Sequence, residues 1–362
     1  MKFTVSKTEI VKALSSTLGV VEKRQALPIL SNVLLKVEDN NISITATDLE
    51  SEVQTTCTPI SVESAGSTTA PAKKLNELCR LLPDGSEISI FLNGDKLSVE
   101  SGSGKYSIST LPSEDFPVFD VVSENTEFTI LGSVLRNLIS KTSFAMGNQD
   151  WRHYLNGLYL SVEDKSITAV ATDAHRLALE SATLNEAILA TIDGIVPRKS
   201  INEIGKLVGE ESENVVIYFG HTSIEVNISG KTFVSKLIEG KFPDYEQVIP
   251  SGESSLLVVD RKMFSESISR VSVLCGEDKK GIKFLTKENS LIISAINKGG
   301  EENLVCEYKG EEIEIGFNVY YLQQILSTIN SDKVVIDFFG SKSCIITDPN
   351  SNSLKYVVMA FI

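Results

Sequence analysis

The sequence lacks most of the patterns on which enzymes depend. Its 362 residues include only three histidines and one tryptophan. It contains no glycine-rich phosphate loop, no Gly-x-Ser-x-Gly motif, no pair of histidines at helical spacing and no Asp-x-Asp pair suited to two metals. We therefore expect a protein that has no catalytic residues, cofactor or bound metal.

Long hydrophobic runs and export signals are missing too. No run of about 18 apolar residues occurs, and the N-terminal MKFTVSKTE has neither the apolar stretch nor the cleavage pattern of a signal peptide. We expect a cytoplasmic protein without membrane contact. The five cysteines are odd in number and widely spaced, which favours buried packing residues in a reducing compartment; they are Cys57, Cys79, Cys275, Cys306 and Cys344.

What the chain does have is internal repetition. Residues 29–50 (ILSNVLLKVEDNNISITATDLE) align without insertion with residues 154–175 (YLNGLYLSVEDKSITAVATDAH). Further segments match in the same order, such as PAKKLNELCRLL with PRKSINEIGKLV. A fainter third copy runs from SLLVVDRKMF to SLKYVVMAFI. We expect three similar tandem domains, spanning residues 1–122, 127–246 and 254–362.

Each copy combines helical and strand patterns. Apolar residues at helical spacing alternate with short, turn-bounded stretches of strand character, so each copy is expected to be an α+β unit of two helices packed on antiparallel sheet. The expected helices cover residues 7–24, 71–82, 133–142, 197–208, 260–274 and 318–330.

Charge is distributed unevenly between these elements. The net charge is −14, yet the six expected helices hold 15 of the 34 basic residues and only 6 of the 48 acidic ones. Such helices are expected to attract a polyanion wherever they converge. The alternative is that lysine and arginine simply favour helices, but Lys73-Lys74 and Arg198-Lys199 recur at equivalent places. The candidate lining residues from this count are Lys23, Lys74, Arg80, Arg136, Lys141, Arg198 and Lys199.

The stretch Asp173-Ala174-His175-Arg176 resembles a miniature catalytic constellation. Ala-Thr-Asp also occurs at residues 46–48, however, where no histidine follows. The repeat therefore predicts an architectural role, in which Asp48 and Asp173 each cap a turn that leaves a strand.

Several motifs together resemble one family over the whole chain: MKFTV, LPILSNVLL, ATDLE, TLPSEDFP, HYLNG, ATDAHRLA, IVPRKS, GKFPDY, IGFNVYYL and YVVM. They are similar to the β subunit of bacterial DNA polymerase III, the sliding clamp. The resemblance implies the DNA clamp fold, in which two chains of three domains close head to tail into a ring. It also implies a non-catalytic homodimer that encircles double-stranded DNA without sequence specificity. A clamp loader complex would load it, and it would tether the DNA polymerase III catalytic subunit for processivity.

The resemblance also assigns roles to residues. DNA contacts would come from Arg24, Lys73, Gln149, His153 and Tyr154, to which the charge count adds Arg198. A hydrophobic groove for clamp-binding peptides of polymerases, loader and repair proteins would be formed by Leu155, Thr172, His175, Arg176, Leu177, Pro243, Val248, Tyr321, Val357 and Met359. The dimer interface would include Lys74, Tyr106, Ile108, Val273, Leu274 and Glu301, with Lys74 and Lys105 facing Glu301 and Glu302.

Two departures from the family pattern concern the groove. Met359 is followed by Ala360-Phe361-Ile362, without the family's usual proline and basic residue, and Glu246-Gln247 replaces a usually basic pair. We therefore expect a groove with an altered peptide preference. A scaffold that is built from the same repeats and binds proteins without encircling DNA is the remaining alternative.

Overall fold

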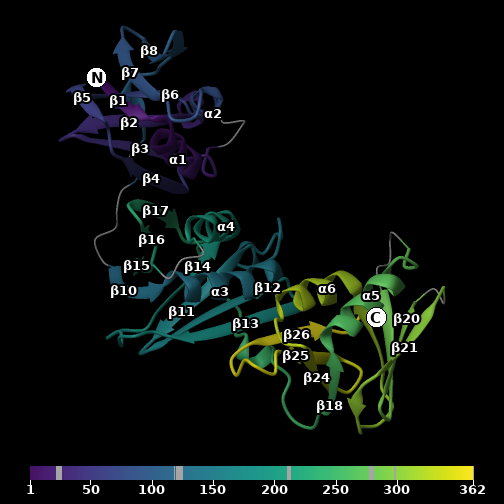
Figure 1. Ribbon diagram of the computed structural model, residues 1–362. Coiled ribbons are helices and arrows are strands. Elements are labelled where there is room, and N and C mark those ends of the chain that lie inside the picture. Colours follow the sequence, from purple (N-terminus) through teal and green to yellow (C-terminus); the bar gives the residue numbers. More distant parts are fainter. Residues whose placement is uncertain are drawn as a thin grey trace. The chain divides into compact units, whose positions relative to one another are not determined.

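A computed structural model describes residues 1–21, 27–117, 119, 125–209, 213–276, 281–296 and 299–361 (Figure 1). Within these ranges the chain forms two compact units, one of residues 1–133 with 202–237 and the other of residues 134–201 with 238–362. The α-helices are α1 (Lys7–Thr17), α2 (Ala72–Leu81), α3 (Gly132–Thr142), α4 (Arg198–Leu207), α5 (Arg261–Ser272) and α6 (Val319–Thr328).

The strands follow the three repeats of the sequence. The first repeat contributes β1 (Lys2–Ser6), β2 (Asn32–Glu38), β3 (Asn41–Thr47), β4 (Ser51–Cys57), β5 (Ser61–Ser64), β6 (Gly66–Pro71), β7 (Glu87–Asn93), β8 (Lys96–Ser101) and β9 (Gly104–Ser109). The second contributes β10 (Asn125–Leu131), β11 (Gly157–Glu163), β12 (Ser166–Thr172), β13 (Arg176–Thr183), β14 (Ile192–Pro197), β15 (Asn214–Gly220), β16 (Ser223–Ile228) and β17 (Lys231–Lys236). The third contributes β18 (Ser255–Asp260), β19 (Gly281–Lys287), β20 (Ser290–Ala295), β21 (Glu301–Val305), β22 (Glu307–Tyr308), β23 (Glu314–Asn318), β24 (Lys333–Phe339), β25 (Ser343–Thr347) and β26 (Lys355–Met359).

The first unit holds two antiparallel sheets. One has the strand order β5-β1-β7-β8-β9, and the other has the order β10-β15-β16-β17-β4-β3-β2-β6. The larger sheet is continuous across two repeats because β17 pairs with β4, with Phe233 opposite Val53. Helices α1 and α2 pack against each other, and α1 packs on β3 and β4. Their buried faces meet the sheets in one apolar core that includes Phe3, Leu14 and Leu75.

The second unit repeats this arrangement. Its nine-stranded sheet has the order β14-β11-β12-β13-β26-β25-β24-β18-β22, and its four-stranded sheet the order β21-β20-β19-β23. Here β13 of the second repeat pairs with β26 of the third, with Leu177 opposite Val357. Helices α5 and α6 pack against each other (Figure 1). The expected α+β class, with helices on antiparallel sheets in tandem repeats, is confirmed.

Local signals position the helix starts. The side chains of Ser6, Asp260 and Asn318 each accept a hydrogen bond from a backbone N–H in the first turn of α1, α5 and α6. The expected end of the first helix at residue 24 is wrong, because α1 ends at Thr17. The Thr17 hydroxyl bonds back to the Leu14 carbonyl, and the Thr17 carbonyl accepts from Val20 N–H, which turns the chain before Val21.

Candidate functional site

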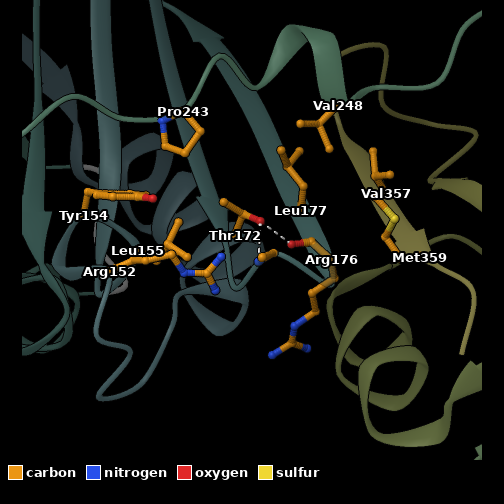
Figure 2. A pocket seen from close by; sticks show the side chains of 11 residues that line it. Arg152, Tyr154, Leu155, Thr172, Arg176, Leu177, Pro243, Val248, Val357 and Met359 are labelled. Carbon is orange, nitrogen blue, oxygen red and sulfur yellow. Dashed lines mark hydrogen bonds between the residues drawn. The ribbon is translucent and has the colours of Figure 1, made fainter.

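An apolar groove opens in the second unit, at the seam between the second and third repeats. Figure 2 shows Tyr154 and Pro243 on one side, Val357 and Met359 on the other, and Leu177 between them. The cavity measures about 250 Å³ and is lined by Arg152, Tyr154, Leu155, Thr172, Ala174, Arg176, Leu177, Pro243, Val248, Val357 and Met359. Because β13 and β26 come from different repeats, neither repeat forms this groove alone.

The floor of the groove is part of a buried apolar cluster. Leu177 and Val357, which face each other across the β13–β26 pair, are only 2% and 1% exposed. Tyr159 stacks on Phe242 beneath the groove, with ring centroids 4.8 Å apart. By contrast, Val248 and Met359 are 41% and 44% exposed at the rim. A buried apolar floor with exposed rim residues suits a short peptide anchored by apolar side chains.

A tight turn carries the chain from β12 into β13 beside the groove. The Asp173 carboxylate accepts hydrogen bonds from the backbone N–H groups of His175 and Arg176, at 3.0 and 3.1 Å. Ala174 adopts a positive φ of 72°. In the first repeat, Asp48 accepts the equivalent bonds from Glu50 and Ser51, at 3.0 and 2.6 Å. The predicted capping role of both aspartates is confirmed.

Arg176 lies at the edge of the groove, but its charged end is directed away from the cavity (Figure 2). Its guanidinium pairs with Asp173 at 3.1 Å and donates to Gln324 Oε1 and to the Phe144 carbonyl, at 2.6 and 2.8 Å. It also lies 4.4 Å from the centroid of the Tyr321 ring. These contacts tie the β12–β13 turn to α6 and leave only the stem of Arg176 to line the groove.

Arg152 is held in a similar way on the opposite side. Its guanidinium makes a bidentate pair with Asp150, at 3.0 and 2.8 Å. The hydrogen bonds from Arg152 lower the pKa of Asp150 to about 2. Asn156 clamps the same loop by accepting from Asp150 N–H and donating to the Asp150 carbonyl. The loop therefore presents its exposed residues in a fixed geometry.

A second, smaller cavity of about 160 Å³ adjoins the first and shares Met359 with it. It is lined by His175, Asn318, Tyr321, Met359, Ala360 and Phe361. Backbone bonds seat the tail: Met359 N–H donates to the His175 carbonyl, and Phe361 N–H donates to the Gly316 carbonyl. A Cβ at Gly316 would lie 2.8 Å from the Phe361 carbonyl oxygen, so this approach requires glycine.

The structure divides the predicted groove residues between these two cavities. Leu155, Thr172, Arg176, Leu177, Pro243, Val248, Val357 and Met359 line the larger one, whereas His175 and Tyr321 line the smaller one. The predicted set lacked Arg152 and Ala174 of the larger cavity and Asn318, Ala360 and Phe361 of the smaller one. Their positions beside Tyr154, His175, Met359 and the IGFNVYYL motif are the signal that could have identified them.

Half of the predicted DNA contacts lie on one loop. Gln149, His153 and Tyr154 belong to the loop that Asp150 and Asn156 hold, although Tyr154 also lines the groove. Arg198 donates to the Met146 and Gly147 carbonyls at the base of this loop. The single tryptophan, Trp151, is 82% exposed on it.

The other predicted DNA contacts lie elsewhere. Lys73 is half-buried on α2 in the first unit, and Arg24 lies outside the described residues. The lining candidate Lys141 instead forms a largely buried ion pair with Glu180, at 3.6 Å. This pair packs β13 against α3 and leaves the Lys141 side chain only 12% exposed, so Lys141 is a packing residue and not a surface contact.

The predicted interface residues lie on two sheet edges and nearby helices. Tyr106 and Ile108 belong to β9, the edge of the five-stranded sheet, and Glu301 belongs to β21, the edge of the four-stranded sheet. Val273 and Leu274 follow α5 and are 81% and 45% exposed, and Lys74 is exposed on α2. Glu302, expected to face a lysine of a second chain, accepts hydrogen bonds from Arg270 of its own chain at 2.7 and 2.8 Å.

Other candidate chemistry has little support in the described parts of the chain. No group of three or more His, Cys, Asp or Glu residues there could hold a metal ion. Burial raises the pKa of Cys57 and Cys79 to about 12. Cys275 is half-buried, so the expectation that all five cysteines are buried is wrong for this one. No helix in these ranges combines the length and apolarity needed to span a bilayer.

The repeated α+β fold, the sheets continuous across repeats and the groove at the seam define a sliding clamp architecture. Three family profiles match in order: DNA polymerase III beta subunit N-terminal domain over residues 1–120, central domain over 129–244 and C-terminal domain over 246–361. The chain belongs to the DNA polymerase III β subunit family. It is therefore a sliding clamp of DNA replication, a processivity subunit without catalytic activity of its own.

Relatives of known name agree over the full length. The beta sliding clamp of Pseudomonas aeruginosa is 40% identical over 363 residues, and that of Escherichia coli strain K12 is 37% identical, each with 99% of both chains covered. The crystal structure of DNA polymerase III subunit beta from Pseudomonas aeruginosa has a TM-score of 0.96 at 39% identity and covers 100% of both chains. The DNA polymerase sliding clamp from Bacillus subtilis has a TM-score of 0.95 at 26% identity, with 100% of this chain and 99% of that chain covered.

Proposed function

We propose that two copies of this chain close head to tail into a ring around duplex DNA, with β9 of one copy pairing with β21 of the other. The observation that carries this proposal is the order of the strands. Strand β4 of the first repeat pairs with β17 of the second, and the equivalent strand β13 of the second pairs with β26 of the third.

This pairing between neighbouring repeats leaves two strands without a partner repeat, one in the third repeat and one in the first. In the third repeat the equivalent of β4 and β13 is β21, and in the first repeat the equivalent of β17 and β26 is β9. Each of these two strands is the end strand of its sheet among the described residues. An unpaired edge is a ready template for another chain, and joining β21 to β9 repeats the seam that the chain already makes twice.

The ring holds DNA by topology, so its contacts are few and free of sequence preference. Arg24, Lys73, Gln149, His153 and Arg198, with Tyr154 at the groove side of the loop, provide these contacts in the proposal. Diffuse contacts with phosphates position a duplex without reading its bases, which leaves the ring free to slide. The acidic remainder of the surface limits stray binding of nucleic acid.

The groove is the docking site for short peptides in this proposal. Its partners are the catalytic subunit of the replicative polymerase, the clamp loader, and other polymerases and repair proteins with clamp-binding peptides. The apolar floor at Leu177 and Val357 supplies area, and the exposed rim at Val248 and Met359 closes over an apolar anchor. We also propose that the three domains span residues 1–122, 127–246 and 254–362. The protein acts in the cytoplasm in this proposal.

A comparison of closed and opened DNA circles tests the ring. The labelled protein is loaded by its clamp loader and ATP onto nicked circular DNA, and the complex is separated from free protein by gel filtration. We expect the protein to stay with the circle and to be lost after a restriction enzyme cuts it, because a linked ring slides off a free end. Blocking both ends with a bound protein should restore retention.

Equal retention on circular and linear DNA without end blocks would contradict encirclement. That result would favour the alternative of a scaffold that binds proteins without encircling DNA and so has no topological link to lose.

A further inference from the structure

The two arginines around the groove suggest a site with positive charge. The contacts of the described residues instead indicate a groove whose unpaired charge is negative. Arg152 and Arg176 are the charged residues that line the larger cavity. Each is neutralised by an aspartate of its own loop or turn, at 2.8 Å for Asp150 and 3.1 Å for Asp173. Neither guanidinium is therefore available as an unpaired positive charge for a bound peptide.

The rim at Pro243–Val248 carries the opposite charge. Asp244 and Glu246 are both exposed on the segment that supplies two lining residues, Pro243 and Val248. Asp244 accepts a hydrogen bond from neutral Gln247, and Glu246 makes no ion pair with any residue in the described ranges. This rim thus has two carboxylates and no positive side chain of its own.

The two carboxylates flank Tyr245, a residue that packs on the apolar cluster of the groove floor. Tyr245 packs on the apolar cluster that includes Leu177 and Val357. Its pKa is raised by burial and, further, by the charges of Glu246 and Asp244. The two acidic side chains therefore lie on either side of a residue that packs on the cluster where a peptide anchor would rest.

We propose that the groove selects clamp-binding peptides that carry lysine or arginine beside their apolar anchor, and disfavours peptides with acidic residues there. This inference rests on the proposed function of the groove as a peptide site. A peptide that fills the cavity must pass Pro243–Val248 closely enough for a flanking side chain to meet Asp244 or Glu246. Rim charges of this kind act mainly on association rate and salt dependence, so the preference should weaken at high salt.

The test uses three peptides with one apolar core, taken from the replicative polymerase of the same organism. Both flanks carry lysine in the first peptide, serine in the second and glutamate in the third. Fluorescence anisotropy with the full-length protein should give affinities in the order lysine, serine, glutamate. The lysine and glutamate peptides should differ about three- to tenfold at low salt, since exposed charge pairs contribute modestly.

The variant Asp244→Asn with Glu246→Gln should remove that difference. Asparagine retains an oxygen that can accept from Gln247, so the rim should keep its fold. A matched control, Glu163→Gln with Glu186→Gln, makes the same change in net charge at exposed positions that do not line the groove. The control should leave the peptide order unchanged.

Three results separate the inference from the function on which it rests. Equal affinities for all three peptides, with binding weakened by Met359→Ala, would overturn the charge preference and leave the groove as a peptide site. A charge order that persists in the Asp244→Asn, Glu246→Gln variant would also overturn it, since the charges responsible would lie elsewhere. Failure of every peptide to bind would remove both proposals.

Discussion

Arg176 brings a full positive charge to a position where only 6% of its side chain is exposed. Such a charge is tolerated only when it is paired and hydrogen-bonded. Asp173, Gln324 and the Phe144 carbonyl satisfy it, so the residue acts as a structural tie between the β12–β13 turn and α6. This structural role explains why an arginine stands beside Asp173 and His175 in a stretch that resembles a catalytic site.

Replacing Arg176 with methionine keeps much of the stem and removes the charge. Asp173 loses its ion pair, although it still accepts two backbone N–H groups, and Gln324 loses a donor. We expect the free energy of unfolding to fall by about 3 kcal/mol, at the low end of the cost of breaking a buried pair, because Asp173 keeps its two backbone donors. Differential scanning calorimetry of the full chain should show the transition of the second unit at a lower temperature.

Arg152→Met provides the matched control. Its pair with Asp150 is more exposed, with side-chain exposures of 27% and 20%, so solvent screens the pair and the expected loss of stability is clearly smaller than for Arg176→Met. Equal losses for the two variants would contradict the structural role assigned to Arg176.

At the scale of the helices and strands, much of the fold could be predicted from sequence. Five of the six helices begin and end within two residues of the expected ranges, because capping residues and apolar spacing are local signals. The two cross-repeat pairings could not be predicted, since β4 and β17 are about 180 residues apart in sequence and nothing local specifies that contact. The direction of the Arg176 guanidinium could not be predicted either, because its partners Gln324 and Phe144 lie in distant segments of the sequence.

Strand β4 carries an acidic residue next to one of these seams. Glu52 lies opposite Val234 of β17 and Thr47 of β3. Burial raises its pKa to about 7, against an ordinary value of 4.5, and a hydrogen bond from the Phe119 backbone offsets part of this shift. The folded chain thus keeps the Glu52 proton over a range in which the unfolded chain has released it.

This difference in pKa between the folded and unfolded chain determines whether the stability of the first unit rises or falls with pH. The contribution of Glu52 to stability is fully present below pH 4.5 and is lost as the pH rises through about 7. Glu52→Gln should therefore melt at a higher temperature than the wild type at pH 8 and show a flatter profile between about pH 5 and 8. Glu50→Gln, at an exposed position of the same segment, should leave the profile unchanged.

At the scale of the whole molecule, the strand pair that joins the repeats within the chain is the same kind of pair that would join two chains in the proposed ring. The repeats are joined twice by the same kind of strand pair, and the groove lies at the second of these seams. The groove and the two unpaired edge strands, β9 and β21, therefore follow from the same rule of strand pairing between repeats. A repeat that exposes one unmatched edge at each end of the chain is suited to a heterologous contact that closes into a ring.

Head-to-tail closure makes a prediction that a symmetric edge-to-edge dimer does not. Leu274→Asp alters only the β21 side of the interface, and Tyr106→Asp alters only the β9 side. Each variant alone should sediment as a monomer, because both contacts of its ring contain a buried aspartate. The fully exposed Leu189 provides the control, and Leu189→Asp should remain dimeric in analytical ultracentrifugation.

Mixing the two interface variants distinguishes the arrangements. A head-to-tail pair then has one contact with both substitutions and one contact with neither. The mixture should therefore regain dimers by mass action while failing to stay on circular DNA, because the ring is open at one contact. If the edges paired β9 with β9 instead, Leu274→Asp alone would leave the dimer intact, and mixing would restore nothing to the Tyr106→Asp chain.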